Sequence, residues 1–120
     1  MANPNIVNVT SILGATLVTT MISTANTTLL VNSASSNALF KIESIQASNT
    51  LASSAAVINL QVSDGTNNEN FLTSVSIPTG STLVALDKNT TIYLTEGYSL
   101  KGSSATNTSI DLIVSYEIIS

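Results

Sequence analysis

The chain has 120 residues, a net charge of −4, three lysines as its basic residues, and no histidine, arginine or cysteine. This length predicts one domain, and so few lysines cannot build the basic surface that nucleic acids and anionic membranes require. Without histidine or cysteine, the chain has no Ser–His pair, no thiol nucleophile and no thiolate or imidazole metal ligand. We therefore expect no nucleic-acid partner, no membrane partner and no cofactor.

The first forty residues carry no charged side chain. An uncharged, β-prone segment of this length aggregates unless other strands or other subunits cover it. Gly14 interrupts its apolar pattern and predicts a bend or a bulge. The strands predicted on either side of this glycine are Ile6–Leu13, residues 16–22 and residues 27–31.

We interpret this segment as contact surface. Either residues 1–8 form an N-terminal arm that adds a strand to a neighbouring subunit, or the segment belongs to the sheets of its own chain. The sequence favours neither arrangement over the other. The candidate interface residues are Ile6, Val7, Val9, Ile12 and Leu13.

The next predicted strand, residues 39–47, changes its apolar parity halfway. Phe40 and Ile42 share one parity, whereas Ile45 and Ala47 share the other. Either a bulge intervenes or both faces are buried. The later strands are predicted at 56–62, 71–77, 82–86, 91–94, 98–101 and 110–118, with turns at Asp64–Asn70, Pro78–Gly80, Asp87–Asn89 and Glu96–Gly97.

Two of the later strands alternate clearly between apolar and polar residues. In one strand Phe71, Thr73, Val75 and Ile77 share one parity, and in the other Ile110, Leu112, Val114, Tyr116 and Ile118 face one way. Short strands at intervals of about ten residues are typical of sandwiches. We predict a single all-β domain over residues 1–120, an antiparallel β-sandwich or jelly-roll-like fold with about 8–10 short strands.

The seven acidic residues offer the remaining route to catalysis. Glycosidases place two carboxylates across a cleft, and such clefts normally carry aromatic platforms for the sugar rings. This chain has no tryptophan, only two phenylalanines and three tyrosines. We therefore expect the acids on outward strand faces and in turns, and we predict no enzyme and no catalytic residue.

The loop from Asp64 to Asn70 contains Asp, Asn and Glu oxygens of the kind that bind Ca²⁺. It lacks the spacing of an EF-hand loop, and Asp64-Gly65 is also an ordinary hairpin sequence. We favour the hairpin and assign no metal ligand.

No signal peptide is recognisable in the sequence. Asparagines and Pro4 interrupt the start of the chain, which also lacks a basic region. The longest apolar stretch, Ile12 to Ile22, contains glycine and threonines and is too short to span a bilayer. We expect a soluble protein that is not secreted through a signal peptide.

Two motifs stand in the C-terminal third: LDK, IYL, EG and SL between Leu86 and Leu100, and SYE from Ser115 to Glu117. Together with the opening MANPNIVNVTSILG, they resemble small all-β virion structural proteins of tailed bacteriophages, especially cyanophages. The matching residues are Leu86, Asp87, Lys88, Ile92, Tyr93, Leu94, Glu96, Gly97, Ser99, Leu100, Ser115, Tyr116 and Glu117.

This resemblance implies a capsid decoration or cement protein, which stabilises the phage head through symmetric protein–protein contacts. It implies a homo-oligomer, either a trimer or a dimer, with a major capsid protein as its second partner. Such a protein is made in the host cytoplasm and ends on the capsid surface of the virion. The resemblance supplies no catalytic residue.

A binding module is the alternative interpretation. A sandwich with polar loops is also typical of receptor- or glycan-binding domains of phage tails, fibres and adhesins. This function would need an exposed pocket or an aromatic platform at the loop ends, and Tyr93 and Tyr98 are the candidate side chains.

Overall fold

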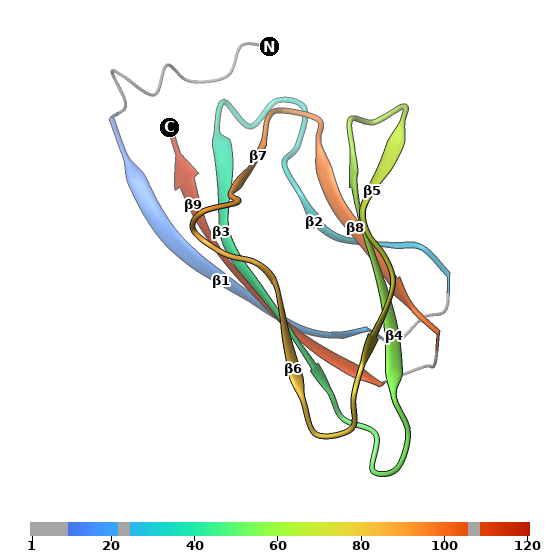
Figure 1. Ribbon diagram of the computed structural model, residues 1–120. Helices are drawn as coiled ribbons and strands as arrows, with labels where there is room; N and C mark the ends of the chain where they lie inside the picture. Colours follow the sequence, from blue (N-terminus) through green and yellow to red (C-terminus); the bar gives the residue numbers. More distant parts are fainter. Residues whose placement is uncertain (1–9, 22–24, 106–108) are drawn as a thin grey trace.

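The computed structural model describes residues 10–21, 25–105 and 109–120. Within these ranges the chain forms nine strands and no helix, and the strands make two antiparallel sheets that face each other (Figure 1). The predicted antiparallel β-sandwich is confirmed. The strands are β1 (Ile12–Met21), β2 (Thr27–Val31), β3 (Leu39–Asn49), β4 (Ala56–Ser63), β5 (Asn68–Ile77), β6 (Thr82–Leu86), β7 (Ile92–Leu94), β8 (Ser99–Ser104) and β9 (Ile110–Ile119).

The larger sheet has five strands in the order β1-β9-β3-β6, and β7 pairs with β3 next to the segment that β6 covers. The smaller sheet has four strands in the order β2-β8-β4-β5. Two pairs of consecutive strands belong to the same sheet: β4 and β5 in the smaller sheet, and β6 and β7 in the larger sheet. At every other connection the chain crosses to the opposite sheet, so neighbours in sequence are mostly not neighbours in a sheet (Figure 1).

Aliphatic side chains from both sheets fill the core. Full burial of one such side chain stabilises a fold by about 1.5–3 kcal/mol. Aromatic rings contribute at the rim, where the ring centroids of Phe40 and Tyr116 lie 5.4 Å apart. The large, fully buried aliphatic residues are Ile42, Ile45, Ile58, Leu60, Ile77, Leu94, Leu100, Ile110, Leu112 and Val114.

A bulge explains the parity change that the sequence shows in β3. Ile42 lies opposite Tyr116, but the next paired residue is Ser44, opposite Ser115, so Glu43 is the extra residue. The bulge turns Ile42 and Ile45 to the same side although they are three positions apart, and both are buried. The bulge is therefore confirmed as the better of the two interpretations of this strand.

Gly14 does not bend the chain, and this prediction was wrong. The strand β1 runs without a register shift from Ile12 to Met21, and Gly14 pairs with Glu117 within it. A long, continuous partner strand, β9, holds both sides of the glycine in one ladder. The start of the predicted first strand, at Ile6, lies outside the described residues.

The predicted alternation in β5 was also wrong at one position. The sequence places Thr73 on one face with Val75 and Ile77, but Thr73 is exposed whereas Val75 is half-buried and Ile77 is buried. The register between β4 and β5 shifts twice, and Ser74 has a positive φ of 51°. These irregularities change which residues face inward.

Candidate assembly surface

The outer face of the larger sheet carries a row of exposed apolar side chains. Strand pairing aligns Val18 of β1 with Ile113 of β9, then Gln46 of β3 and Val84 of β6. Val18 is 74% exposed, Val84 57% and Ile113 42%. Neighbouring strands lie about 4.8 Å apart, so this outer row spans about 14 Å. The row thus presents three exposed aliphatic side chains, with the polar Gln46 between Ile113 and Val84.

Small hydroxyl side chains flank the outer row on both sides. On one side, Thr20 donates a hydrogen bond from Oγ1 to Oδ1 of Asp111 at 2.9 Å, and the hydroxyls of Ser48 and Thr82 lie 2.9 Å apart. On the other side lie Thr16, Ser115 and Ser44. Asp111 is thus the only charged residue in the three rows, and its charge is partly satisfied within the sheet.

Charged groups gather further along the same face. Nζ of Lys41 lies 3.1 Å from Oε1 of Glu43, and Lys41 pairs with Glu117 on one side and with Tyr93 on the other. The hydrogen bond and charge of Glu43 hold the pKa of Lys41 above its usual value of 10.5. This exposed cluster is an ion pair with solvated neighbours, and an exposed pair of this kind contributes little to stability.

The outer face of the smaller sheet differs in its chemistry. Its amide side chains bond to each other: Asn26 donates to Gln61 at 2.6 Å, and Gln61 donates to Asn70 at 2.7 Å. Its one large exposed apolar side chain among the described residues is Val31, which is 54% exposed. Because these amides are paired with each other and the face has one large exposed apolar side chain among the described residues, it is the weaker candidate for a subunit contact.

The predicted interface residues fall partly on the described chain. Ile12 and Leu13 open β1 and are 58% and 60% exposed, so both are available for contact. Ile6, Val7 and Val9 lie outside the described residues.

Sequence reasoning missed the outer row. Val18 directly follows Leu17, and Ile113 directly follows Leu112, and both leucines pack in the core. Two consecutive apolar residues in a strand suggest that both faces of the strand are buried, so the sequence does not mark Val18 and Ile113 as exposed. The available signal was the register itself, because the outward residues of adjacent strands align only once the pairing is known.

Sequence reasoning also missed two buried asparagines that connect loops to strands. Nδ2 of Asn32 donates to the carbonyl oxygens of Ala38 at 2.9 Å and of Leu94 at 2.8 Å, and its Oδ1 accepts from the hydroxyl of Ser36. Asn49 acts in the same way, because its Nδ2 donates to Ser54 and Ile77. Both roles are structural.

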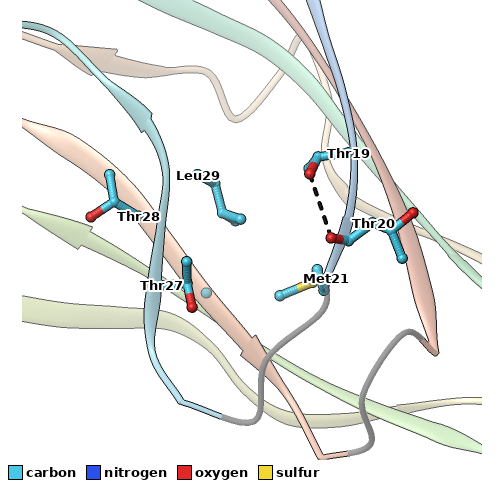
Figure 2. A pocket seen from close by; sticks show the side chains of 7 residues that line it. Thr19, Thr20, Met21, Thr27, Thr28 and Leu29 are labelled. Carbon is cyan, nitrogen blue, oxygen red and sulfur yellow. Dashed lines mark hydrogen bonds between the residues drawn. The ribbon is translucent and has the colours of Figure 1, made fainter.

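A pocket lies where the edge strands of the two sheets approach each other, β1 of the larger and β2 of the smaller. Figure 2 shows Thr19, Thr20 and Met21 on one side and Thr27 to Leu29 on the other. Its volume of about 150 Å³ is below the range of about 300–1,000 Å³ that ligand sites occupy. Its polar lining consists of threonine hydroxyls and includes no charged side chain, and Oγ1 of Thr19 bonds to the carbonyl oxygen of Thr20 at 3.5 Å.

A second pocket of about 200 Å³ lies beside the β4–β5 hairpin, lined by Tyr98, Val62, Asp64, Asn67 and Glu69. Oδ1 of Asp64 accepts the backbone N–H of Asn67 at 2.7 Å and that of Thr66 at 2.9 Å, and these bonds lower the pKa of Asp64. The carboxylate therefore closes the turn, in agreement with the hairpin interpretation. Over residues 10–21, 25–105 and 109–120, no three acidic side chains gather as a metal site.

The described part of the chain contains no helix long and apolar enough to cross a membrane.

No protein-family model matches the chain, and no curated protein matches it. Among solved structures, it is similar to a pentameric capsid protein isolated from metagenomic phage sequences, with a TM-score of 0.39 and 14% identity, over 88% of this chain and 64% of that one. A second structure described in the same words has a TM-score of 0.39 and 13% identity, over 88% of this chain and 60% of the other. This chain spans less than two thirds of the length of either protein.

Proposed function

We propose that this protein is a non-enzymatic structural component of a phage virion, a decoration or cement protein that binds in many copies to the capsid surface. The observation that carries the proposal is the exposed outer row of Val18, Ile113 and Val84, which together with its two flanking rows contains only one charged residue, Asp111. Such a face favours burial against a large protein surface. The proposed partners of the protein are further copies of the chain and a major capsid protein.

The motif that resembles phage virion proteins has a structural role in this chain. Leu86, Leu94 and Leu100 are core residues, and Gly97 has a φ of +85° in the turn before β8. The N–H of Gly97 donates to the carbonyl oxygen of Asn32 at 2.8 Å. These motif residues therefore contribute to the core and to a turn, which supports a structural role for the motif.

The strand order supports a jelly roll. With β6 and β7 counted as one interrupted strand, each sheet has four strands, and the chain alternates between sheets as in two Greek keys. Jelly rolls recur in viral capsid proteins, and this agreement is an analogy of fold.

The proposal is tested by counting copies of the protein in purified particles of the phage that encodes it. Quantitative mass spectrometry should find a fixed, high ratio to the major capsid protein. Its absence from intact particles would contradict the proposal.

A matched pair of variants tests the surface. Val84→Asp places a charge in the outer row and should weaken binding to particles that lack the protein. Val31→Asp places the same charge on the opposite sheet, at a similarly exposed valine, and should leave binding unchanged. Equal loss in both variants would show that the outer row is not the contact surface.

A glycan-binding module of a tail, fibre or adhesin is the second candidate function. The pocket that joins Tyr98 to Asp64, Asn67 and Glu69 favours it, because it combines an aromatic ring with hydrogen-bonding groups at the end of the sandwich. Glycan-array binding that is lost in Tyr98→Ala and kept in Tyr93→Ala would favour this function over the first.

A further inference from the structure

Strand β1 forms one edge of the larger sheet. Among the described residues, the strand is hydrogen-bonded only to β9, and its other side faces away from the sandwich (Figure 1). An edge strand presents a row of N–H and C=O groups that can pair with another strand.

The register identifies which backbone groups of β1 are free. Ser11 and Ser120 exchange both of their backbone hydrogen bonds, each at 2.9 Å. In an antiparallel pair, hydrogen-bonded and non-hydrogen-bonded residues alternate. The odd-numbered residues of β1 therefore bond to β9, and the even-numbered residues direct their N–H and C=O groups to the free edge. These are Ile12, Gly14, Thr16, Val18 and Thr20, and of them the carbonyl oxygen of Thr20 also accepts a long hydrogen bond of 3.5 Å from Oγ1 of Thr19.

The other three sheet edges are interrupted. The edge formed by β6 and β7 breaks at the turn between them and contains a register shift. Strand β2 is five residues long and shifts register between Thr28 and Leu30. Strand β5 shifts register twice and contains Ser74 with a positive φ. Short strands and bulges are the devices by which proteins prevent pairing at an edge.

Strand β1 has none of these devices. Its ten residues pair in one unbroken register, and they include no proline and no charged side chain. The chain as a whole carries a net charge of −4, so an uncharged edge is where two copies can approach with the least repulsion.

Contacts within one chain do not explain why β1 has a glycine at position 14 and an exposed valine at position 18. A Cβ built on Gly14 would meet nothing within 4 Å, and its backbone is not left-handed, so neither crowding nor conformation requires glycine. Val18 is the most exposed of the large apolar residues in the described chain. A strand glycine often marks a position where another chain approaches closely.

We propose that two copies of this chain pair through β1, antiparallel and edge to edge, about a two-fold axis at Thr16. Thr16 then lies opposite Thr16 of the second copy, and Val18 lies opposite Gly14. In this register all five outward residues, from Ile12 to Thr20, find a partner. The two five-stranded sheets join into one continuous sheet. This inference rests on the proposed assembly role and names a second copy of the chain as the partner of the β1 edge.

A second copy fits this edge better than an unrelated strand for two reasons. An isologous pair matches a surface with itself, so the partner has the same length and the same lack of charge. Within the described chain, β1 is also the only edge strand that offers ten uninterrupted residues for pairing.

Single cysteines test the register directly, because the natural chain contains none. In Thr16→Cys the two thiols sit on directly opposed residues, whose Cα atoms are about 5.5 Å apart. In Val18→Cys the two positions are shifted by four residues, about 14 Å. In Ser44→Cys the two cysteines lie on the β3 strands of the two copies, with β9 and β1 of each copy between them, so five strand spacings separate them by about 24 Å. A bifunctional thiol reagent too short for the last two separations should link only Thr16→Cys.

Cross-linking that is as efficient in Ser44→Cys as in Thr16→Cys would indicate stacked sheet faces and would overturn edge pairing. Cross-linking in Val18→Cys alone would overturn the Thr16-centred register. A monomer by light scattering at the concentrations used would overturn the proposal altogether.

A second experiment uses valines at the two edges of the same sheet. Val18→Lys should raise the dimer dissociation constant at least about tenfold, because a lysine on an edge opposes pairing. Val84→Lys changes an exposed valine at the far edge, which is 57% exposed and is proposed to contact the capsid and not the second copy. It should leave the dimer dissociation constant unchanged, and circular dichroism should show the same fold for both variants.

The particle count separates this inference from the proposed function. Abundant copies in virions with a monomeric protein in solution and no Thr16→Cys link would overturn the pairing alone. A cross-linked dimer that is absent from virions would overturn the virion role alone.

Discussion

At the scale of single residues, stability depends on buried polar groups with complete hydrogen bonding. Asn32 is fully buried, yet its side chain and backbone bonds join the β2–β3 loop, β7 and the turn before β8. Burial of an amide is favourable only when its donors and acceptors are satisfied. In a chain with so few charges, such amides replace ion pairs as the polar links between loops and strands.

Replacing Asn32 by alanine should therefore destabilise the protein by about 2–3 kcal/mol, because the buried carbonyls of Ala38 and Leu94 lose their donor. Urea unfolding gives this value. Asn89→Ala, in an exposed turn, is the control and should stay within about 0.5 kcal/mol of the natural chain. A loss in Asn32→Ala no larger than in the control would show that water satisfies these carbonyls.

Gly102 is required by close packing. A Cβ at this position would lie 2.9 Å from the carbonyl oxygen of Asn59, 2.9 Å from Cδ2 of Leu60 and 3.0 Å from Cε of Met21. Gly102→Ala should cost about 1–3 kcal/mol. Gly14→Ala, where no atom is within 4 Å, should cost much less or nothing. Thermal unfolding of the two variants compares them, and equal destabilisation would contradict the packing argument.

At the scale of elements, β9 organises the larger sheet. It pairs along its whole length with β1 on one side and with β3 on the other. Its first half alternates strictly between buried and exposed residues, since one side faces the core and the other faces solvent. The alternation in the sequence predicts this strand well because the burial is one-sided.

Neighbouring residues in β9 should thus respond differently to truncation. Leu112→Ala removes a fully buried side chain and should cost about 2–5 kcal/mol. Ile113→Ala removes an exposed side chain of the outer row and should cost less than about 1 kcal/mol in the free monomer. Chemical denaturation of dilute protein measures both, and similar losses would mean that Ile113 is covered in solution.

At the scale of the whole molecule, the few titrating groups limit the response to pH. Backbone N–H groups of Asn67 and Thr66 lower the pKa of Asp64, so its contribution to stability is present above its usual value of 3.8 and is lost as the pH falls through the lower folded value. The pKa of Lys41 is raised by Glu43, so its contribution is present below 10.5 and is lost as the pH rises through the higher folded value.

Neither of these changes falls near neutral pH, and the chain has no histidine. The free energy of unfolding should therefore be nearly constant between about pH 5 and 8 and should fall in acid below about pH 4. Urea unfolding curves recorded at a series of pH values, from below pH 4 to pH 8, measure this free energy. A steep change between pH 5 and 8 would reveal another carboxylate with a perturbed pKa.

Much of the element list could be predicted from the sequence. The bounds of β2 and β6 agree with the predicted segments 27–31 and 82–86, because turn residues enclose short apolar runs. Gly14 and Thr73 were mispredicted since their environment depends on the partner strand. A glycine in a continuous ladder and a bulge at Ser74 both depend on pairing, which local sequence does not encode.

By itself, the sequence determined an all-β chain with an uncharged N-terminal region and no histidine or cysteine chemistry, because composition and alternation act locally. Only the tertiary structure decided which apolar residues are core and which form the outer row of Val18, Ile113 and Val84. It also decided that β1 is an uninterrupted edge. Strand order and register bring together residues that are nearly one hundred positions apart, as in the pairing of Val18 with Ile113. Pairing over such separations depends on the fold as a whole.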